Sequence, residues 1–316
     1  MSAALVDPTN PVPETAPVAR SGHRGGLWLA RARAVGLGLL GLLAVAGLWE
    51  AYKALGPEDG VLVGENRVLP RTTDLAMPHV WDMVQRLGEP VTSLGDAEPL
   101  WRVVLDASVV SLGIATVGWL VGTTVGLLLA VLMQRVRIAE WGLLPWIVLS
   151  QTVPLIAFAP VVRSWGSRIE IAGWEWPPWL SVALIASYLA FFPVAVGALK
   201  GLQSPDRIHT ELLRSYAASA TDTLRKVRIP ASVPYLLPAL RLGAASAVIG
   251  GVVAEVSTGY LDGIGRLLVS YAGQASGDPA KAWAPIFGAI GLGLVAAGFV
   301  ALLGVLMRNY RRGEAV

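Results

Sequence analysis

The sequence predicts an all-α membrane protein with six transmembrane helices, and two observations support this prediction. The chain of 316 residues is 54% hydrophobic and only 15% charged, whereas soluble domains carry about 25% charged residues. The hydrophobic residues are also gathered into stretches of roughly 20, the length at which a helix crosses about 30 Å of hydrocarbon. A chain of this composition needs a lipid bilayer to cover its apolar side chains.

Six apolar segments divide the chain. They cover residues 34–49, 103–133, 141–162, 179–199, 236–256 and 285–307. We expect residues 1–33 to form a cytoplasmic disordered tail and residues 34–312 to form the transmembrane domain. Basic residues before a short apolar core are also typical of a cleaved signal peptide, but the long tail favours an uncleaved first span. Between the first two spans, residues 78–87 are predicted to form an amphipathic helix with Val80, Met83 and Val84 on one face.

The placement of basic residues predicts that both termini are cytoplasmic and that the protein lies in the bacterial plasma membrane. With the N-terminus inside, the inner segments hold 15 of the 25 Lys and Arg residues, in agreement with the positive-inside rule. Seven Trp residues then lie near the outer ends of the spans, where an aromatic belt is expected. They are Trp49, Trp101, Trp165, Trp174, Trp176, Trp179 and Trp283.

Small residues recur every four positions in two of the spans. The positions are Gly118, Gly122 and Gly126 in the second span, and Gly243, Ala247 and Gly251 in the fifth. Residues four apart share a helix face, and small residues there let two membrane helices approach closely. We expect these ridges to pack within the chain; the alternative is that one of them contacts a second copy.

The sequence contains no recognisable catalytic motif. None of its four lysines ends a phosphate-binding loop, its three histidines are far apart and it has no cysteine. These absences remove the usual patterns for ATP binding, zinc sites and thiol chemistry. We expect a transport subunit rather than an enzyme, with no cofactor, no metal and no nucleic-acid partner.

The polar segment between the fourth and fifth spans, residues 200–233, is predicted to form two helices joined by a turn. Leu212, Leu213 and Tyr216 form one apolar stripe on the first helix. A short amphipathic hairpin needs a partner surface, which is either the groove of another protein or the underside of its own bundle.

The second helix of this segment has a predicted start and a predicted end. Ser219 is a candidate N-cap, and Asp222 lies three residues on, as in a capping box. Pro230 is expected to end the helix.

This segment resembles the cytoplasmic motif of the integral subunits of type I ABC importers. That motif reads E-A-A, three residues, Gly, nine residues and I-x-L-P, and the spacing here is the same from Glu211 to Pro230. In the family the segment is a coupling helix that sits in a groove of the ATPase subunit. The resemblance therefore implies an ATPase-coupling role for Glu211, Leu212, Leu213, Arg214, Tyr216, Ala217, Ser219, Val227, Ile229 and Pro230.

Ala217 departs from the family pattern, because it stands where the motif has glycine. Glycine adopts a left-handed backbone readily, whereas alanine loses about 1–2 kcal/mol there. Either the turn differs in this chain, or contact with the ATPase compensates for the strain.

Over roughly residues 65–310 the chain resembles the nitrate, sulfonate and taurine permeases. The matching stretches are Leu69-Pro70, residues 150–160, Phe192-Pro193, residues 201–205, Ala254-Glu255 and residues 263–265. The stretches Ser150-Gln-Thr-Val-Pro and Phe-Phe-Pro are more similar to members that carry riboflavin or the hydroxymethylpyrimidine precursor of thiamine. Residues 163–179 depart from the family, because they are longer, rich in Trp and charged.

Three prolines interrupt the third span, and they suggest a translocation path. Pro145, Pro154 and Pro160 remove backbone hydrogen bonds, which membrane helices tolerate where the backbone lines a cavity or is buried in protein. Gln151 and Thr152 would then face a polar path, and Pro154 would shape it. Simple kinks with satisfied polar neighbours are an equal alternative.

Three more residues are candidates for the path. Tyr188 and Phe192, together with Phe191, could stack on a flat ring, although aromatic residues in a span are more often packing residues. Glu255 is an ionisable residue at membrane depth, which makes it a candidate site by default. The alternative for Glu255 is a structural partner, such as Arg241 or a backbone amide.

The resemblance implies a mechanism with several partners. Two copies of the chain would form the pore, separate ABC ATPase subunits would drive it, and an extracytoplasmic solute-binding protein would deliver the solute. Closure of the ATPase dimer would reach the pore through the coupling helices as rigid-body rocking. A secondary transporter would need internal repeats and ion-coupling residues in the membrane, and a membrane-embedded scaffold is the other alternative.

Overall fold

The computed structural model describes residues 24–63, 66–93 and 95–306, which divide into two units at Gly56. Helix α1 (Arg24–Leu55) makes up the described part of the first unit, and it contains the predicted first span. Residues 24–33 are helical and do not form the disordered tail predicted for them. The rest of that tail and the end of the predicted domain after 306 lie outside the described residues.

The second unit opens with short elements. Strands β1 (Val61–Val63) and β2 (Asn66–Leu69) pair in an antiparallel hairpin, and helix α2 (Val80–Gly88) follows. The predicted amphipathic helix forms, and on its apolar face Met83 is buried whereas Val84 is 56% exposed. Leu87 packs against the cluster around Leu100.

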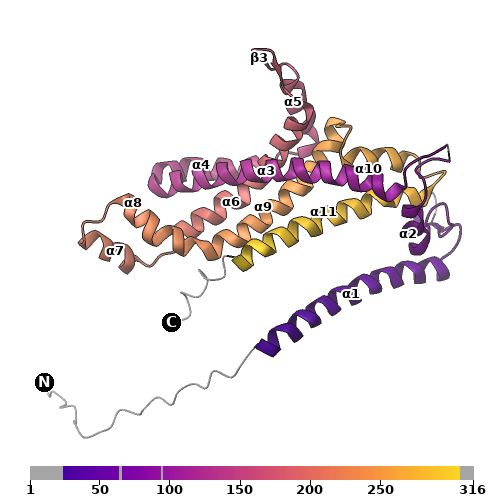
Figure 1. Ribbon diagram of the computed structural model, residues 1–316, viewed down its shortest axis with the longest axis horizontal. Coiled ribbons are helices and arrows are strands. Elements are labelled where there is room, and N and C mark those ends of the chain that lie inside the picture. Colours follow the sequence, from indigo (N-terminus) through magenta and orange to yellow (C-terminus); the bar gives the residue numbers. More distant parts are fainter. Residues whose placement is uncertain (1–23, 64–65, 94, 307–316) are drawn as a thin grey trace, which may run out of the picture. The chain divides into compact units, whose positions relative to one another are not determined.

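Four long helices form the body of this unit (Figure 1). They are α3 (Leu100–Arg135), α6 (Pro178–Leu202), α9 (Ile229–Thr258) and α11 (Pro279–Leu306). They contain the second, fourth and fifth predicted spans, and the sixth up to residue 306. All four are long and apolar enough to cross a membrane.

The small-residue ridges pack within the chain. A Cβ atom added at Gly118 would lie 2.5 Å from the Cβ of Ala186, and one at Gly122 would lie 2.6 Å from the carbonyl oxygen of Ser187. On α9, a Cβ atom added at Gly243 would lie 3.0 Å from a methyl group of Val194. These contacts join α3 and α9 to α6, so the intramolecular alternative is the one the structure supports.

The third predicted span is not continuous. Helices α4 (Arg137–Ser150) and α5 (Leu155–Gly166) are bent by 102° at the four residues between them. Pro154 lies at this bend, because its missing N–H cannot continue the helical ladder. Among the described residues there are five candidate spans, or up to six if the bent pair counts as one. The sequence analysis expects prolines to interrupt the span over 141–162, and the structure places the sharp break at Pro154, whereas Pro145 and Pro160 lie inside helices.

A short hairpin follows α5 and stands away from the long helices (Figure 1). Strands β3 (Glu170–Ile171) and β4 (Trp174–Glu175) form it, joined by Ala172 and Gly173 with positive φ. This is the Trp-rich segment that departs from the family pattern.

The predicted helix–turn–helix forms, but Pro230 does not end its second helix. Helix α7 (Arg207–Ser215) is followed by α8 (Ala220–Thr223), a π-helical turn η1 (Leu224–Arg228) and then α9 without interruption. In the π turn the Ile229 N–H bonds to the Leu224 carbonyl, five residues back. Pro230, which has no N–H to donate, comes directly after this π turn, and the helix continues through it. Helix α10 (Ile264–Gly273) lies between α9 and α11.

Candidate functional site

Helix α7 presents an uncovered apolar stripe. Ile208 is 70% exposed, Leu212 is 54% exposed and Tyr216, just after the helix, is 76% exposed. Leu213 is half-buried, and none of the residues of α7 is fully buried. On the polar side Arg207 pairs with Glu211 at 3.2 Å, a surface ion pair that contributes little to stability. The stripe therefore remains free for a partner.

The turn after α7 is a Schellman motif with alanine at its left-handed position. The N–H of Ala218 bonds to the Leu213 carbonyl, and the N–H of Ala217 bonds to the Arg214 carbonyl. These are the two bonds that define the motif. Ala217 has φ +53°, so the turn keeps the glycine-like conformation in spite of the alanine.

The start of α8 is capped as predicted. The Ser219 hydroxyl accepts a hydrogen bond from the Asp222 N–H at 3.0 Å, and it donates to the Asp222 carboxylate at 2.5 Å. Lys226 pairs with the same carboxylate at 3.2 Å. This cap orders the helix immediately after the strained turn.

Beyond the cap, the segment is anchored to the bundle. Leu224 is 8% exposed and packs with Leu199 and Leu202 of α6. The Arg228 guanidinium donates to the Leu202 carbonyl at 2.9 Å. Val227 is half-buried, whereas Ile229 and Pro230 are exposed. The ten predicted coupling residues thus form one continuous feature, free at α7 and fixed at η1.

The predicted path residues do not form one cluster. Gln151, Thr152 and Pro154 lie together at the bend between α4 and α5. The Tyr188 hydroxyl donates to the Ser150 carbonyl there. Pro154 has no N–H to offer this carbonyl, which accepts from the Val153 N–H at 3.3 Å as well as from the phenol.

The aromatic residues of α6 make packing contacts. Tyr188 has ring contacts with Phe158 and Phe191, at centroid distances of 5.5 and 5.9 Å. Phe192 is half-buried and packs against the cluster around Ala198 and Leu199. The packing alternative describes both Tyr188 and Phe192 in this structure.

Glu255 is 1% exposed, and both of its carboxylate oxygens are hydrogen-bonded. One accepts from the Ser111 hydroxyl at 2.6 Å, and the other accepts from the Gly265 N–H at 2.8 Å. A backbone amide is therefore a partner, as one alternative anticipated. Arg241 is not, because its guanidinium lies beside Gly304 on α11.

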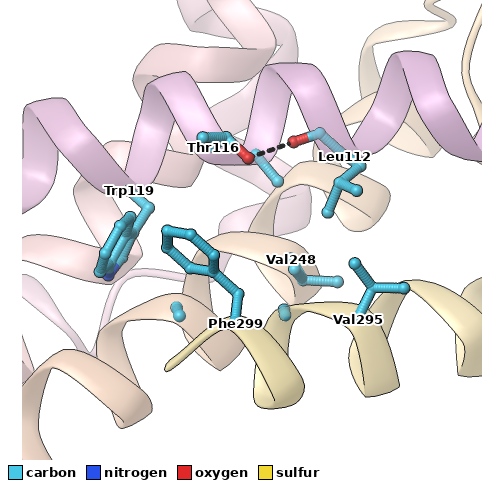
Figure 2. A pocket seen from close by; sticks show the side chains of 9 residues that line it. Leu112, Thr116, Trp119, Val248, Val295 and Phe299 are labelled. Atoms are coloured by element: carbon cyan, nitrogen blue, oxygen red, sulfur yellow. Dashed lines mark hydrogen bonds between the residues drawn. The ribbon is translucent and has the colours of Figure 1, made fainter. Parts of the chain in front are cut away.

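The structure also contains an apolar groove that the sequence did not reveal. A cavity of about 150 Å³ lies between α3, α9 and α11. Figure 2 shows Trp119 and Phe299 at one end of it and Leu112 and Val295 at the other. The two rings meet edge-on at 5.9 Å. None of the predicted path residues lines this groove.

Sequence reasoning missed the residues that surround Glu255. Ser111 reads as an ordinary small residue of the second span, and Ile264 and Gly265 contribute only backbone N–H groups. The sequence does contain one sign of this site: two glycines, at 263 and 265, that follow an intramembrane carboxylate within ten residues.

Comparisons with known proteins agree on one kind of protein. Residues 122–311 match the family model described as "Binding-protein-dependent transport system inner membrane component". The formylaminopyrimidine transport permease protein ThiX of Halalkalibacterium halodurans is 28% identical over 196 residues, 61% of this chain and 71% of that protein. A probable ABC transporter permease protein of Haemophilus influenzae is 32% identical over 173 residues, 55% of this chain and 65% of that protein.

A solved structure shows the same fold. The crystal structure of an amino acid ABC transporter with histidines matches with a TM-score of 0.51 and 17% identity. The match covers 66% of this chain and 94% of that chain. The relatives are ABC permease subunits, which are transport components rather than enzymes, and the family implies ATPase and solute-binding partners. The chain therefore belongs to the family of inner-membrane components of binding-protein-dependent transport systems, as a multi-pass permease subunit of an ABC importer.

Proposed function

We propose that this permease imports a pyrimidine-type vitamin precursor, and that α7, its turn and α8 dock on the ATPase subunit from the cytoplasm. The observation that carries the docking proposal is the exposed stripe of Ile208, Leu212 and Tyr216 on a helix that its own bundle leaves uncovered. Exposed apolar anchors at this spacing are typical of a helix that lies in a partner's groove.

The substrate proposal has a separate basis. The relative ThiX is named as a formylaminopyrimidine permease, and the stretch from Ser150 to Pro154 resembles permeases of the thiamine-precursor and riboflavin branch. Riboflavin is the second candidate, followed by nitrate, sulfonate or taurine. Calorimetry on the solute-binding protein of the same system tests this choice. Binding of an aminopyrimidine supports the proposal, whereas binding of only riboflavin, a sulfonate or nitrate contradicts it.

The proposal also includes the assembly of the permease and its orientation in the membrane. Two copies of the chain form the pore, both termini are cytoplasmic, and the solute-binding protein docks on the outer side. The path passes the bend between α4 and α5, where Gln151, Thr152 and Pro154 surround a break in the backbone. Tyr188 and Phe192 support this bend from α6, and Glu255 acts at the outer end of α9.

Charge reversal in α7 tests the docking role. Glu211→Arg and deletion of residues 211–219 are expected to reduce co-purification of the ATPase at least tenfold, which corresponds to about 1.4 kcal/mol of lost affinity. Glu175→Arg is the matched control, because Glu175 is also exposed but lies in the β4 strand. Full transport and intact co-purification after the deletion would refute the docking proposal.

A further inference from the structure

The coupling segment, residues 211–230, leads from α7 into a long helix that carries Glu255 near its other end. The helical run from Ala220 to Thr258 is unbroken over 39 residues, a length of roughly 58 Å at 1.5 Å per residue. In Figure 1, α7 and α8 lie at one end of the bundle, and α10 lies at the other. A displacement of α8 is therefore applied to a single long element that ends beside α10.

At that far end, Glu255 ties three helices together in a closed ring of hydrogen bonds. Its carboxylate joins Ser111 of α3 to the Gly265 N–H at the start of α10, at 2.6 and 2.8 Å. The Ser111 hydroxyl in turn accepts from the Ile264 N–H at 2.8 Å. The first two N–H groups of α10 have no partner within their own helix, so their attachment to the bundle passes through Glu255 and Ser111.

Two glycines, Gly263 and Gly265, allow the backbone before and at the start of α10 to approach Glu255 closely. A Cβ atom at Gly263 would lie 2.3 Å from the carboxylate carbon of Glu255, and one at Gly265 would lie 2.6 Å from the Glu255 Cβ. Gly263 has φ −93°, so what the glycine provides here is space and not a left-handed backbone. Any side chain at these positions would push α10 away from α9.

Helix α10 connects this ring to the neighbouring helices. Ile264, Leu267 and Tyr271 are buried in the cluster that contains Leu100 of α3 and Ala284 of α11. Motion of α10 would therefore be felt where α3 begins and where α11 begins. Glu255 stands between the long helix and this cluster.

We propose that Glu255 is a positioning residue for transport, which couples displacement of the α8–α9 helix to α10 and so to the outer end of the bundle. The inference rests on the proposed function, because it takes α7 and α8 as the point where the ATPase acts. The ring of Glu255, Ser111 and the α10 N-terminus makes the far end of α9 and α10 move as one body. Without this ring of hydrogen bonds, we expect α8 to move when the ATPase acts while α10 does not follow.

The absence of cysteine in the chain makes a labelling test direct. Leu261, which is 63% exposed in the loop before α10, is replaced by Cys in the complex with its ATPase in proteoliposomes. The rate of reaction with a membrane-impermeant maleimide is measured without nucleotide and after trapping with ATP and vanadate. In the parent we expect the two rates to differ about fivefold.

Three variants then isolate the ring. Glu255→Ala and Ser111→Ala are expected to give the same labelling rate in both states while the complex still traps vanadate. Glu255→Gln keeps an acceptor for the Gly265 N–H, and it is expected to restore most of the difference. Ser257→Ala is the control, because the Ser257 hydroxyl, within the described part of the chain, bonds to the Val253 carbonyl of its own helix and to no other group, and it should behave as the parent.

The outcomes separate the two proposals. A nucleotide-dependent rate that survives in both Glu255→Ala and Ser111→Ala overturns the coupling role of Glu255, and so does a parent whose rate does not change. Variants that no longer assemble with the ATPase, with Glu255→Gln equally affected, reduce Glu255 to a structural role and also overturn the inference. A different result would contradict the docking proposal: vanadate trapping that persists in the complex after deletion of residues 211–219.

Discussion

The interface of α3 with α6 and the segment from α7 to α8 are built in opposite ways. In the interface, backbones meet so closely that Gly122 has no room for a Cβ atom. In the segment, Leu212 and Tyr216 are more than half exposed, and Ala217 holds a left-handed backbone. The first region derives its rigidity from contacts within the chain, whereas the second leaves apolar side chains exposed and holds a strained backbone. Under the docking proposal, the first region serves stability and the second serves recognition of the ATPase.

The largest effect on stability is expected from a large side chain placed in the α3–α6 interface. Gly122→Leu places a side chain where a Cβ would already lie 2.6 Å from the Ser187 carbonyl oxygen and 2.9 Å from the Ala190 Cβ. Overpacking against backbone costs about 3 kcal/mol at the upper end of the usual range. We expect loss of the folded protein, measured as the monodisperse fraction in size-exclusion chromatography in detergent.

Gly113→Leu is the matched control on the same helix. No atom of the described residues lies within 4 Å of a Cβ at Gly113, which is exposed, so the change should stay within about 0.5 kcal/mol. Equal damage from the two substitutions would show that any large residue in α3 is disruptive, and that the close contact with α6 is not the cause.

A second prediction uses two leucines of the coupling segment. Leu224→Ala removes a side chain that is 8% exposed and packs on α6, and it should cost about 2 kcal/mol of stability. Leu212→Ala removes one that is 54% exposed, and it should change thermal unfolding little while weakening ATPase binding. Thermal unfolding in detergent and ATPase co-purification are measured on both. Similar thermal shifts for the two variants would remove the distinction between the fixed and the free part of the segment.

Most of the fold was predictable because hydrophobic length and small-residue spacing are local signals. The second, fourth and fifth spans lie within α3, α6 and α9, and the Ser219 cap forms as its sequence indicated. The failures concern prolines, whose effect depends on the neighbouring backbone. Pro230 reads as a helix end, but the π turn at 224–228 lets the helix continue through it. Pro145 and Pro160 lie inside helices, whereas Pro154 marks the sharp bend.

The site was predictable in part, for a related reason. The residues proposed to couple to the ATPase lie within one stretch of 20 residues, so their pattern can be read from the sequence. The partners of Glu255 come from α3 and from the backbone of α10, at separations of 144 and 10 residues. Backbone donors have no residue signature, so only the fold reveals them.

The smallest predicted effect concerns the strain itself. Ala217 has φ +53°, and Ala217→Gly should relieve about 1 kcal/mol, seen as roughly fivefold slower amide exchange of Ala218, whose N–H closes the Schellman turn. Ala218→Gly is the control, because position 218 has no positive φ, so its own amide should not exchange more slowly once the rate is corrected for the intrinsic exchange of glycine. Faster exchange in both variants would contradict the left-handed assignment.

Ala217→Gly also tests whether the backbone strain at Ala217 persists when the segment is bound to the ATPase. If the docked segment keeps this turn, the relief is equal in the free and bound states, and the affinity for the ATPase does not change. If docking moves Ala217 to a relaxed backbone, the alanine favours the bound state, because binding releases the strain. Ala217→Gly would then weaken ATPase binding by about fivefold, the equivalent of about 1 kcal/mol. A titration of the ATPase against the parent and the Ala217→Gly permease therefore shows whether the turn at Ala217 keeps its conformation on docking or relaxes.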